Sequence, residues 1–384
     1  MGVIETSKKY LADTYGREDV IFYKGKGATL TDIYGEKYID FGCGIAVNGL
    51  GTGFRKWKRA VKRQIGRIAH ASNLFYTQPA AELAKLLCRR TGMKKAFFSN
   101  SGAEANECAI KTARKYSFDK YGENRAVIVT LENSFHGRTV TALSATGQEA
   151  FHQYFMPFTE GFRFVPANDA AAMEAALTDD VCAVMLELVQ GEGGVIALDK
   201  EYVQAVEKLC KKKDILLMID EVQTGNGRTG TLYAFQQYGV SPDVMTTAKG
   251  LGNGLPIGAT LFSAKCEKTL TPGTHGSTFG GNPAACAGAV AVIKSINDKL
   301  LKGVEEKALR IRETLLACSK VKSVSGLGLM IGAEVENAAE LKKQCLQKGL
   351  VVLTAKDRLR LLPPLNIGND ELERGLAILR EVLQ

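Results

Sequence analysis

Short apolar segments alternate with amphipathic helical patterns through the middle of the chain. Strands are expected at Lys95–Ser99, Ala126–Leu131, Val181–Glu187, Ile215–Ile219 and Asp243–Thr247. The helical patterns between them include Glu104–Tyr121 and Glu201–Lys213. This alternation predicts an α/β fold with a mainly parallel sheet covered by helices. Ligands of such sheets bind at the carboxyl ends of the strands, so a functional site is expected there.

The pattern changes toward both ends of the chain. Beyond about Gly281 it predicts a long helical stretch, then Ser323–Glu336, a helix near Ala338–Lys348 and the apolar run Leu350–Leu353. These segments are typical of a smaller α+β domain, and the strand-like first 50 residues are expected to pack with it. We therefore predict an N-terminal segment at 1–50, a large domain at 51–281 and a small domain at 282–384.

The composition excludes several classes of protein. Hydrophobic residues make up 45% of the 384 residues and charged residues 24%, which argues against disordered, collagen-like and membrane-bundle chains. No apolar run approaches 18 residues and no apolar signal core precedes the first domain, so a cytoplasmic protein without membrane spans is expected. The nine cysteines form no closely spaced pair and the four histidines are scattered. Reduced thiols and no metal site are therefore predicted.

The net charge of +9 raises the question of a polyanionic partner. The basic residues are densest in 54–67, where Phe54, Trp57, Val61 and Ile65 recur at helical spacing. This pattern favours an amphipathic helix with a solvated basic face. Nucleic-acid binding would require aromatic residues among the exposed basic ones, whereas Trp57 lies on the apolar face. No nucleic-acid partner is expected.

Three segments that follow predicted strands could carry chemistry. In the first, 99–104 (SNSGAE), small residues open a helix. Free backbone amides at a helix start bind anions, phosphate above all. The same residues also fit an ordinary N-cap at Ser101, and the sequence leaves both interpretations open.

The second segment is Asp220-Glu221, a carboxylate pair at the end of a very apolar strand. The run 225–230 (GNGRTG) after it matches the letters of a dinucleotide-binding fingerprint. It stands five residues from the strand and lacks the acidic residue about 20 positions further on, so we interpret it as a loop.

The third segment surrounds Lys249, which ends an apolar, hydroxyl-bearing run and is followed by Gly250, Gly252 and Gly254. Most lysines are solvated surface charges. Burial here would lower the pKa of the amine and make it nucleophilic, as Schiff-base chemistry requires. A phosphate cradle, a carboxylate for a ring nitrogen and an amine for an aldehyde together indicate pyridoxal 5'-phosphate.

The chain resembles the class III, fold-type I aminotransferases from about Leu30 to its C-terminus. The resemblance rests on eight ordered motifs: DFGCGIAVNGLG (40–51), SNSGAEANECAIKTARK (99–115), SFHGRT (134–139), ELVQGEGG (187–194), DEVQTGNGRTG (220–230), TAKGLGNGLPIGA (247–259), GSTFGGNP (276–283) and RLLPPLNI (360–367). It departs from the family at 52–56, where relatives usually show His-x-His-Pro. The fold implied is a large domain with a mainly parallel sheet and a smaller α+β domain built from both chain ends.

The resemblance assigns a role to each matching residue at the cofactor. Lys249 would bind pyridoxal 5'-phosphate covalently and then shuttle the substrate proton. Asp220 would pair with the pyridinium nitrogen and Gln223 with the ring hydroxyl. The remaining cofactor-binding residues implied are Ser101, Gly102, Ala103, Phe135, Glu187 and Thr278, where Thr278 would reach the phosphate of a neighbouring subunit in a homodimer.

The resemblance also implies a set of substrate-binding residues. Arg138 would bind the α-carboxylate of the amino donor, and Arg360 that of glutamate or 2-oxoglutarate. Glu192 would pair with Arg360 while the donor is bound and release it for the dicarboxylate. Ser277 is the remaining substrate-binding residue expected.

Within the family, the resemblance is strongest to enzymes that move the δ-amino group of N2-acetylornithine to 2-oxoglutarate in arginine biosynthesis. The products would be N-acetylglutamate 5-semialdehyde and glutamate. Alternatives are an aminotransferase acting on ornithine, succinylornithine or 4-aminobutyrate, and an inactive binding protein with the same fold.

Overall fold

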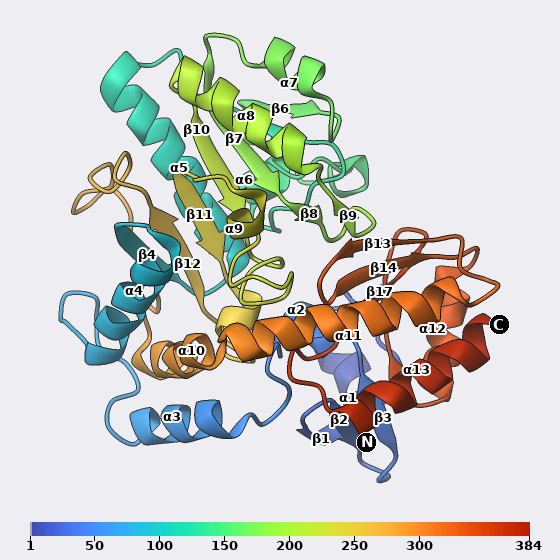
Figure 1. Cartoon of the computed structure of the whole chain (residues 1–384). Coiled ribbons are helices and arrows are strands. Elements are labelled where there is room, and N and C mark those ends of the chain that lie inside the picture. Colours follow the sequence, from blue (N-terminus) through green and yellow to red (C-terminus); the bar gives the residue numbers. More distant parts are fainter. Residues whose placement is uncertain (1) are drawn as a thin grey trace.

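A seven-stranded sheet forms the centre of the larger half of the molecule (Figure 1). The computed structural model describes residues 2–384. The spatial order of the strands is β4 (Lys95–Ser99), β12 (Gly258–Phe262), β11 (Val244–Thr247), β10 (Leu216–Asp220), β7 (Val181–Glu187), β5 (Val127–Leu131) and β6 (Phe162–Val165). Six strands run in one direction and β12 runs against both of its neighbours. The prediction of a mainly parallel sheet is confirmed.

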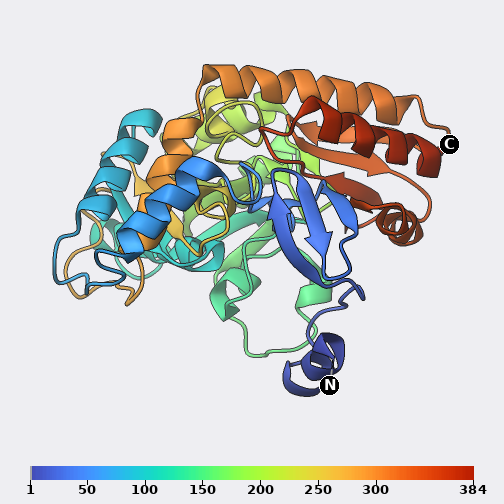
Figure 2. The same cartoon turned by 90° about the horizontal axis from the view of Figure 1, so that it is seen from below.

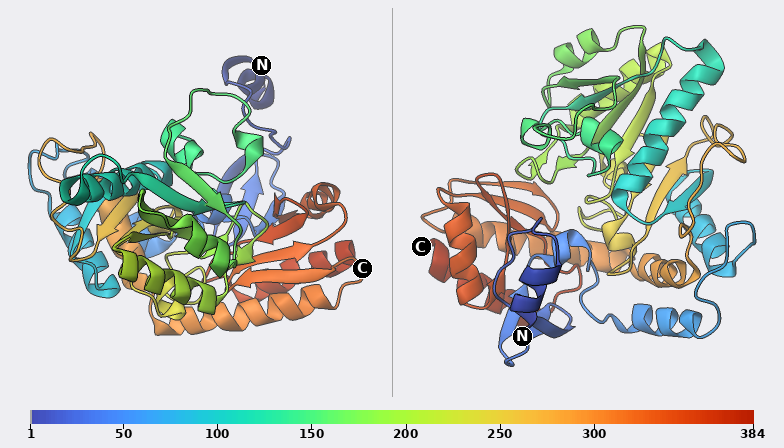
Figure 3. Two further views of the ribbon diagram at one scale, coloured as in Figure 1. Left: turned by 90° about the horizontal axis from the view of Figure 1, so that it is seen from above. Right: turned by 180° about the vertical axis from the view of Figure 1, so that it is seen from behind.

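Helices cover both faces of this sheet (Figure 3). Every residue of β7 is buried, with Met185 facing the side of α5 (Gly102–Tyr121) and Leu186 facing the opposite core. The opposite face is covered by α8 (Lys200–Lys213), among other helices. This burial on both faces explains why the predicted strands are continuous apolar runs rather than alternating ones. All five predicted strands are present, whereas β6 and β12 are not among the predicted strands.

Three helices pack together beside the sheet: α3 (Arg55–Ile65), α4 (Gln78–Thr91) and α10 (Pro283–Ser295). Their close approach depends on small residues in α10, because a Cβ at Gly288 would lie 2.8 Å from the indole nitrogen of Trp57. The basic helix predicted around 54–67 is therefore present as α3. The prediction of its apolar face is wrong at one position, because Ile65 is 55% exposed and Gln64 is buried instead.

The smaller half contains an antiparallel sheet and three helices. The strand order is β13 (Ser323–Leu327), β14 (Met330–Glu334), β17 (Arg358–Leu361) and β16 (Leu353–Ala355). The helices are α11 (Asp298–Leu316), α12 (Ala338–Gln347) and α13 (Asn369–Leu383). Leu300 in α11 packs against the hydrophobic cores of both halves, so this helix connects them.

The N-terminal strands join the smaller half through one further sheet. Its order is β1 (Phe22–Lys26), β2 (Thr29–Asp32), β3 (Lys37–Asp40) and β15 (Leu350–Val351), with β3 and β15 parallel. The two chain ends thus share a sheet. The division of the chain at residues 50 and 281 remains a prediction. Helix α10 follows residue 281 but packs on α3 and α4 and shares the hydrophobic core of the large sheet. Helix α1 (Val3–Tyr10) buries no residue and extends away from the body in Figure 2.

The remaining elements are short and lie mostly around the end of the large sheet. They are α2 (Cys43–Ala46), α6 (Val140–Ser144), η1 (Glu149–Phe151), α7 (Ala170–Ala176), β8 (Val189–Gln190), β9 (Ile196–Ala197), α9 (Phe235–Tyr238) and η2 (Lys249–Leu251). Within residues 2–384, no helix is both long enough and apolar enough to span a membrane.

Candidate active site

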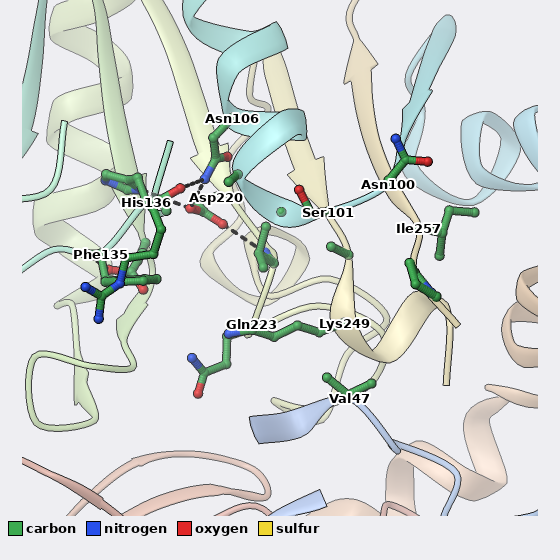
Figure 4. Close-up of a pocket in the computed structure, with 18 of the residues that line it drawn as sticks. Val47, Asn100, Ser101, Asn106, Phe135, His136, Asp220, Gln223, Lys249 and Ile257 are labelled. Carbon is green, nitrogen blue, oxygen red and sulfur yellow. Dashed lines mark hydrogen bonds and ion pairs between the residues drawn. The ribbon is translucent and has the colours of Figure 1, made fainter. Parts of the chain in front are cut away.

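A cavity of about 430 Å³ opens at the carboxyl ends of the parallel strands (Figure 4). Strands β4, β7, β10 and β11 end at it or lead into it. Nine residues predicted from the sequence line this cavity: Ser101, Gly102, Ala103, Phe135, Arg138, Glu187, Asp220, Gln223 and Lys249. The sheet edge therefore brings together side chains that are up to about 150 positions apart in the sequence.

Asp220, the last residue of β10, is held from several directions. Its Oδ2 accepts hydrogen bonds from Asn106 Nδ2 at 2.8 Å and lies 2.9 Å from His136 Nδ1. Its Oδ1 accepts from the backbone N–H of Val222 at 2.9 Å. Asn106 is fixed in turn, since its side-chain oxygen accepts from Thr246 Oγ1 at 2.7 Å. The carboxylate is 4% exposed and cannot rotate without breaking these contacts, so it presents a fixed negative charge to the cavity.

Glu187 occupies the equivalent position on the neighbouring strand. It pairs with Asp220 in the β7–β10 register, and its Oε2 accepts from the backbone N–H of Phe135 at 2.8 Å. Burial raises the pKa of Glu187 to about 7, with His136 opposing this shift and Asp220 adding to it. A carboxyl group that titrates near neutrality beside a fixed carboxylate is typical of a catalytic or cofactor site.

Lys249 follows β11 as the first residue of η2, and its side chain extends across the cavity in Figure 4. Its backbone adopts φ 43°, a left-handed conformation that is uncommon for a residue with a side chain. Burial lowers the pKa of the amine, and the nearby guanidinium of Arg360 lowers it further against the opposing effect of Glu192. The amine is thereby shifted toward its neutral, nucleophilic form.

The start of α5 supplies a candidate anion cradle. The Ser101 side chain accepts from the backbone N–H of Glu104 at 3.1 Å, and Glu104 Oε2 accepts from the N–H of Asn100 at 2.5 Å. These bonds cap the helix, yet within residues 2–384 the amides of Gly102 and Ala103 have no acceptor. The two interpretations of this segment are thus compatible, because the side chain caps the helix while two amides face the cavity.

Arg360 and Glu192 form a two-point ion pair beside the cavity. The distances are 2.6 Å between Nη1 and Oε1 and 3.2 Å between Nη2 and Oε2. Arg360 also donates to the Gly191 carbonyl at 3.2 Å and to Gln223 Oε1 at 3.4 Å. Arg360 is 3% exposed, so its charge depends on Glu192 for neutralisation. The structure brings this predicted pair together.

Phe135 and Arg138 occupy the mouth of the cavity. Both follow β5 and belong to one turn, in which Gly137 lies so close to α5 that a Cβ would come within 2.7 Å of the Ala103 side chain. The Arg138 guanidinium carbon lies 5.7 Å from the centroid of the Phe135 ring. Arg138 itself is exposed, in contrast to Arg360.

Ser277 and Thr278 lie outside this cavity, on a neighbouring surface depression. Ser277 accepts from the backbone N–H of Gly280 at 2.9 Å and from Asn100 Nδ2 at 3.3 Å. Thr278 is exposed on the surface. Their predicted roles therefore find no partner in the site of the same chain and remain predictions.

Among the lining residues that the sequence prediction missed are Asn106, His136 and Val222. Each lies inside one of the family motifs. Asn106 and His136 have no functional partner nearby in the sequence, because Asp220 is 114 positions from Asn106 and 84 from His136. Val222 packs so closely on the helix start that a Cβ at Gly102 would lie 2.6 Å from its Cγ1. The available signal is that His136 and Val222 closely follow the ends of β5 and β10, whereas Asn106 lies within α5.

The groups around the cavity define the class of ligand that it can bind. An anion cradle, a buried carboxylate and a buried amine around one cavity of an α/β fold fit a phosphorylated pyridine aldehyde. Among residues 2–384, no group of three potential metal ligands is found.

Comparisons with known proteins give the family. The family model for class III aminotransferases matches residues 10–383. An acetylornithine aminotransferase from Haemophilus ducreyi is 52% identical over 97% of this chain and 96% of its own length. One from Caldanaerobacter subterraneus is 48% identical over 99% of both chains. The crystal structure of N-acetylornithine aminotransferase from Stenotrophomonas maltophilia superposes with a TM-score of 0.86 at 36% identity, covering 99% of this chain and 98% of that one.

A solved ornithine aminotransferase from Toxoplasma gondii superposes with a TM-score of 0.95 at 32% identity, covering 99% of this chain and 94% of that one. The chain belongs to the class III aminotransferases, and its cofactor is pyridoxal 5'-phosphate, as the family uses. The residues present fit this group, because the free amides of Gly102 and Ala103, the fixed Asp220 carboxylate and the buried Lys249 amine surround one cavity.

Proposed function

We propose that this chain transfers the δ-amino group of N2-acetylornithine to 2-oxoglutarate, giving N-acetylglutamate 5-semialdehyde and glutamate. Relatives named acetylornithine aminotransferase, which match over nearly their full length at 42–52% identity, support the proposal. The observation in the structure that carries it is the Glu192–Arg360 pair beside a cavity whose mouth holds a second arginine, Arg138, for which residues 2–384 supply no ion pair.

Lys249 is the proposed catalytic base and the point of covalent attachment. When bound, pyridoxal 5'-phosphate supplies an electron sink that stabilises negative charge on the substrate carbon. The lowered pKa of Lys249 favours the neutral amine, which can accept the proton from that carbon and return it to the cofactor side. Lys249 lines the same cavity as Asp220 and Phe135, in which the cofactor and both substrates are proposed to bind.

Asp220 is proposed to keep the ring nitrogen protonated. Asn106, His136 and Val222 already bind its two carboxylate oxygens. One lone pair of Oδ1 remains for a ring N–H. Phe135 and Val222 line the cavity and are proposed to contact the two faces of the ring, and Gln223 its hydroxyl.

The two arginines offer a way for one cavity to accept two different substrates. While Glu192 neutralises Arg360, the free guanidinium is that of Arg138, which suits a donor with one carboxylate near the mouth. Displacement of Glu192 would free Arg360 for the α-carboxylate of glutamate or 2-oxoglutarate. The switch costs little if the dicarboxylate replaces the contacts that Glu192 gives up.

We further propose a homodimer in which Thr278 contacts the phosphate site of the partner subunit. Leu74, Phe75 and Tyr76 are more than 70% exposed, which is unusual for consecutive large apolar residues. Asn73, directly before them, donates to the carbonyls of Ser277 and Gly280 at 2.9 Å. The apolar segment and the Thr278 loop thus form one surface suited to a second copy. The nine unpaired cysteines favour a cytoplasmic location.

A comparison of amino donors tests the proposed function. Steady-state kcat/KM would be measured for N2-acetylornithine, N2-succinylornithine, ornithine and 4-aminobutyrate, each with 2-oxoglutarate. The proposal expects N2-acetylornithine to give the highest value. A clear preference for ornithine or 4-aminobutyrate would assign the chain to a different branch of the family, and the absence of turnover with every donor would favour an inactive binding protein.

A further inference from the structure

The guanidinium of Arg138 rests on an aromatic ring rather than on a carboxylate. Its carbon lies 4.2 Å from the centroid of the Phe151 ring, closer than to the Phe135 ring. Within residues 2–384 the guanidinium forms no hydrogen bond and no ion pair. Phe151 is therefore the nearest group that restrains a long and otherwise exposed side chain.

The segment that carries Phe151 is fastened to the turn that carries Arg138. Gln148 Nε2 donates to the Ser134 carbonyl at 2.9 Å, and His152 Nε2 lies 2.9 Å from the Leu143 carbonyl. Phe151 lies between these two anchors. These anchors hold the backbone of Phe151 close to the turn that carries Arg138.

The backbone of Arg138 is fixed from the other side. Gly137 packs against Ala103, and Thr139 Oγ1 donates to Glu107 Oε1 at 2.5 Å. The turn is thus clamped to α5, and only the side chain of Arg138 is free to choose among rotamers. Contact with the Phe151 ring favours one of them.

A stacked guanidinium keeps its binding edge free. Contact between a cation and an aromatic ring uses the face of the guanidinium plane, whereas its N–H groups lie in the plane. A carboxylate can therefore bind the edge in a two-point geometry while the face stays on the ring. An ion-paired arginine would first have to release its partner, as Arg360 must.

We propose that Phe151 is a positioning residue for the amino donor: it holds the Arg138 guanidinium ready for the donor's α-carboxylate. Phe151 also meets Phe135 edge to face at 5.8 Å, so the same ring ties the carboxylate site to the aromatic wall of the cofactor cavity. The inference rests on the proposed function, which gives Arg138 the α-carboxylate of the donor.

The test measures the two half-reactions separately in the holoenzyme, by single-turnover changes in cofactor absorbance. Phe151→Leu keeps an apolar side chain but removes the ring. We expect kcat/KM for N2-acetylornithine to fall roughly three- to tenfold, the range of a partly exposed contact between a cation and a ring. The value for 2-oxoglutarate should stay within about twofold of the unmodified enzyme, since Arg360 is untouched. Phe151→Tyr should restore the donor half-reaction.

A donor without the carboxylate isolates the effect. N-acetyl-1,4-diaminobutane carries the same reacting amine and amide but no α-carboxylate. We expect Phe151→Leu to leave its kcat/KM unchanged. In an Arg138→Leu background, Phe151→Leu should cause no further loss with N2-acetylornithine, because coupled residues are not additive.

Tyr154→Leu is the matched control, because Tyr154 lies in the same segment, is 68% exposed and has its ring against Phe155. We expect it to leave the donor half-reaction unchanged. An equal loss in Tyr154→Leu, an equal loss for both substrates of Phe151→Leu, or an equal loss with the donor that lacks a carboxylate would overturn the inference while leaving the proposed function in place. If the unmodified enzyme does not use N2-acetylornithine, the proposed function fails and the inference with it.

Discussion

The inner and outer ends of the cavity are built on different principles. At the inner end Asp220, His136 and Asn106 are almost fully buried and bonded to one another. At the mouth Arg138 is exposed and rests on a ring, and Thr278 lies outside on a neighbouring surface. The inner end is complete within one chain. The outer end is shaped for groups that arrive from outside, namely the substrates and, as proposed, a second subunit.

This difference predicts that changes at the inner end affect every substrate, whereas changes at the outer end discriminate between substrates. Glu192 and Arg360 lie between these extremes, since they are buried but form a pair that can separate.

The largest effect after loss of Lys249 is expected for Asp220→Asn. The change keeps the shape but removes the fixed negative charge, so the ring nitrogen loses its stabilised proton. We expect kcat to fall about 10²- to 10³-fold for both half-reactions, as for the loss of other fixed electrostatic groups in active sites. Single-turnover kinetics with both substrates measure this. A loss confined to one half-reaction would contradict an inner end that serves all substrates.

A change at Glu192 should instead separate the two substrates. Glu192→Ala leaves the charge of Arg360 without its partner at 2.6 Å. We expect kcat/KM for N2-acetylornithine to fall about tenfold and that for glutamate to stay level or rise, because the freed cation favours a dicarboxylate. Glu336→Ala, on the exposed surface of the smaller half, is the control. Equal losses for both amino donors would argue against the switch.

Gly102→Ala probes the anion cradle. The new Cβ would lie 2.6 Å from Cγ1 of Val222, whose branched side chain has little freedom to turn away. We expect the affinity for pyridoxal 5'-phosphate to fall about tenfold, in line with the cost of overpacking a buried site. Titration of the apoenzyme with cofactor gives the Kd. Gly16→Ala, where a Cβ would have open space around it and the backbone is not left-handed, controls for general effects of the substitution. An unchanged Kd would place the phosphate elsewhere.

The smallest effect concerns stability rather than activity. Glu221 follows Asp220 but points away from the cavity, where it accepts from the N–H of Phe235 at 2.7 Å. Burial raises the pKa of Glu221 from 4.5 to about 7. Between these pH values Glu221 is protonated more fully in the folded chain than in the unfolded chain. The contribution of Glu221 to stability is therefore complete below pH 4.5 and is lost as the pH rises through 7.

Glu221→Gln removes this titration. The free energy of unfolding of the unmodified protein should fall with rising pH, by up to about 1.4 kcal/mol per pH unit from this group, and the variant should show a flatter dependence. Denaturant unfolding at a series of pH values measures both slopes, with Glu306→Gln as a surface control. Identical slopes for the two proteins would contradict the raised pKa.

The same contrast explains what the sequence could predict. Asp220 is the last residue of the apolar strand β10 and Lys249 follows β11 by two residues, so their placement at one sheet edge follows from the pattern alone. Asn106 and His136 escaped the prediction because their function depends on which strands are neighbours. The order that places β5, β7 and β10 side by side is a tertiary property.

Other features lay beyond the sequence pattern for similar reasons. The antiparallel β12 is as apolar as its parallel neighbours, and its direction is set by the chain connection rather than by its residues. The contact of Arg138 with Phe151 joins a loop residue to the last residue of the short helix η1, where the sequence has no periodicity. Thr278 and Ser277 matched the family motifs, yet a single chain does not contain the partner that their predicted roles require.

The central claim is that the Lys249 amine carries the chemistry of this cavity. Absorbance spectroscopy of Lys249→Ala, purified with added pyridoxal 5'-phosphate, tests it most directly, with the exposed Lys294→Ala as control. We predict that Lys249→Ala loses the near-visible band of covalently bound cofactor and loses activity by at least about 10³-fold, while Lys294→Ala retains both. A retained band and measurable turnover in Lys249→Ala would contradict the account.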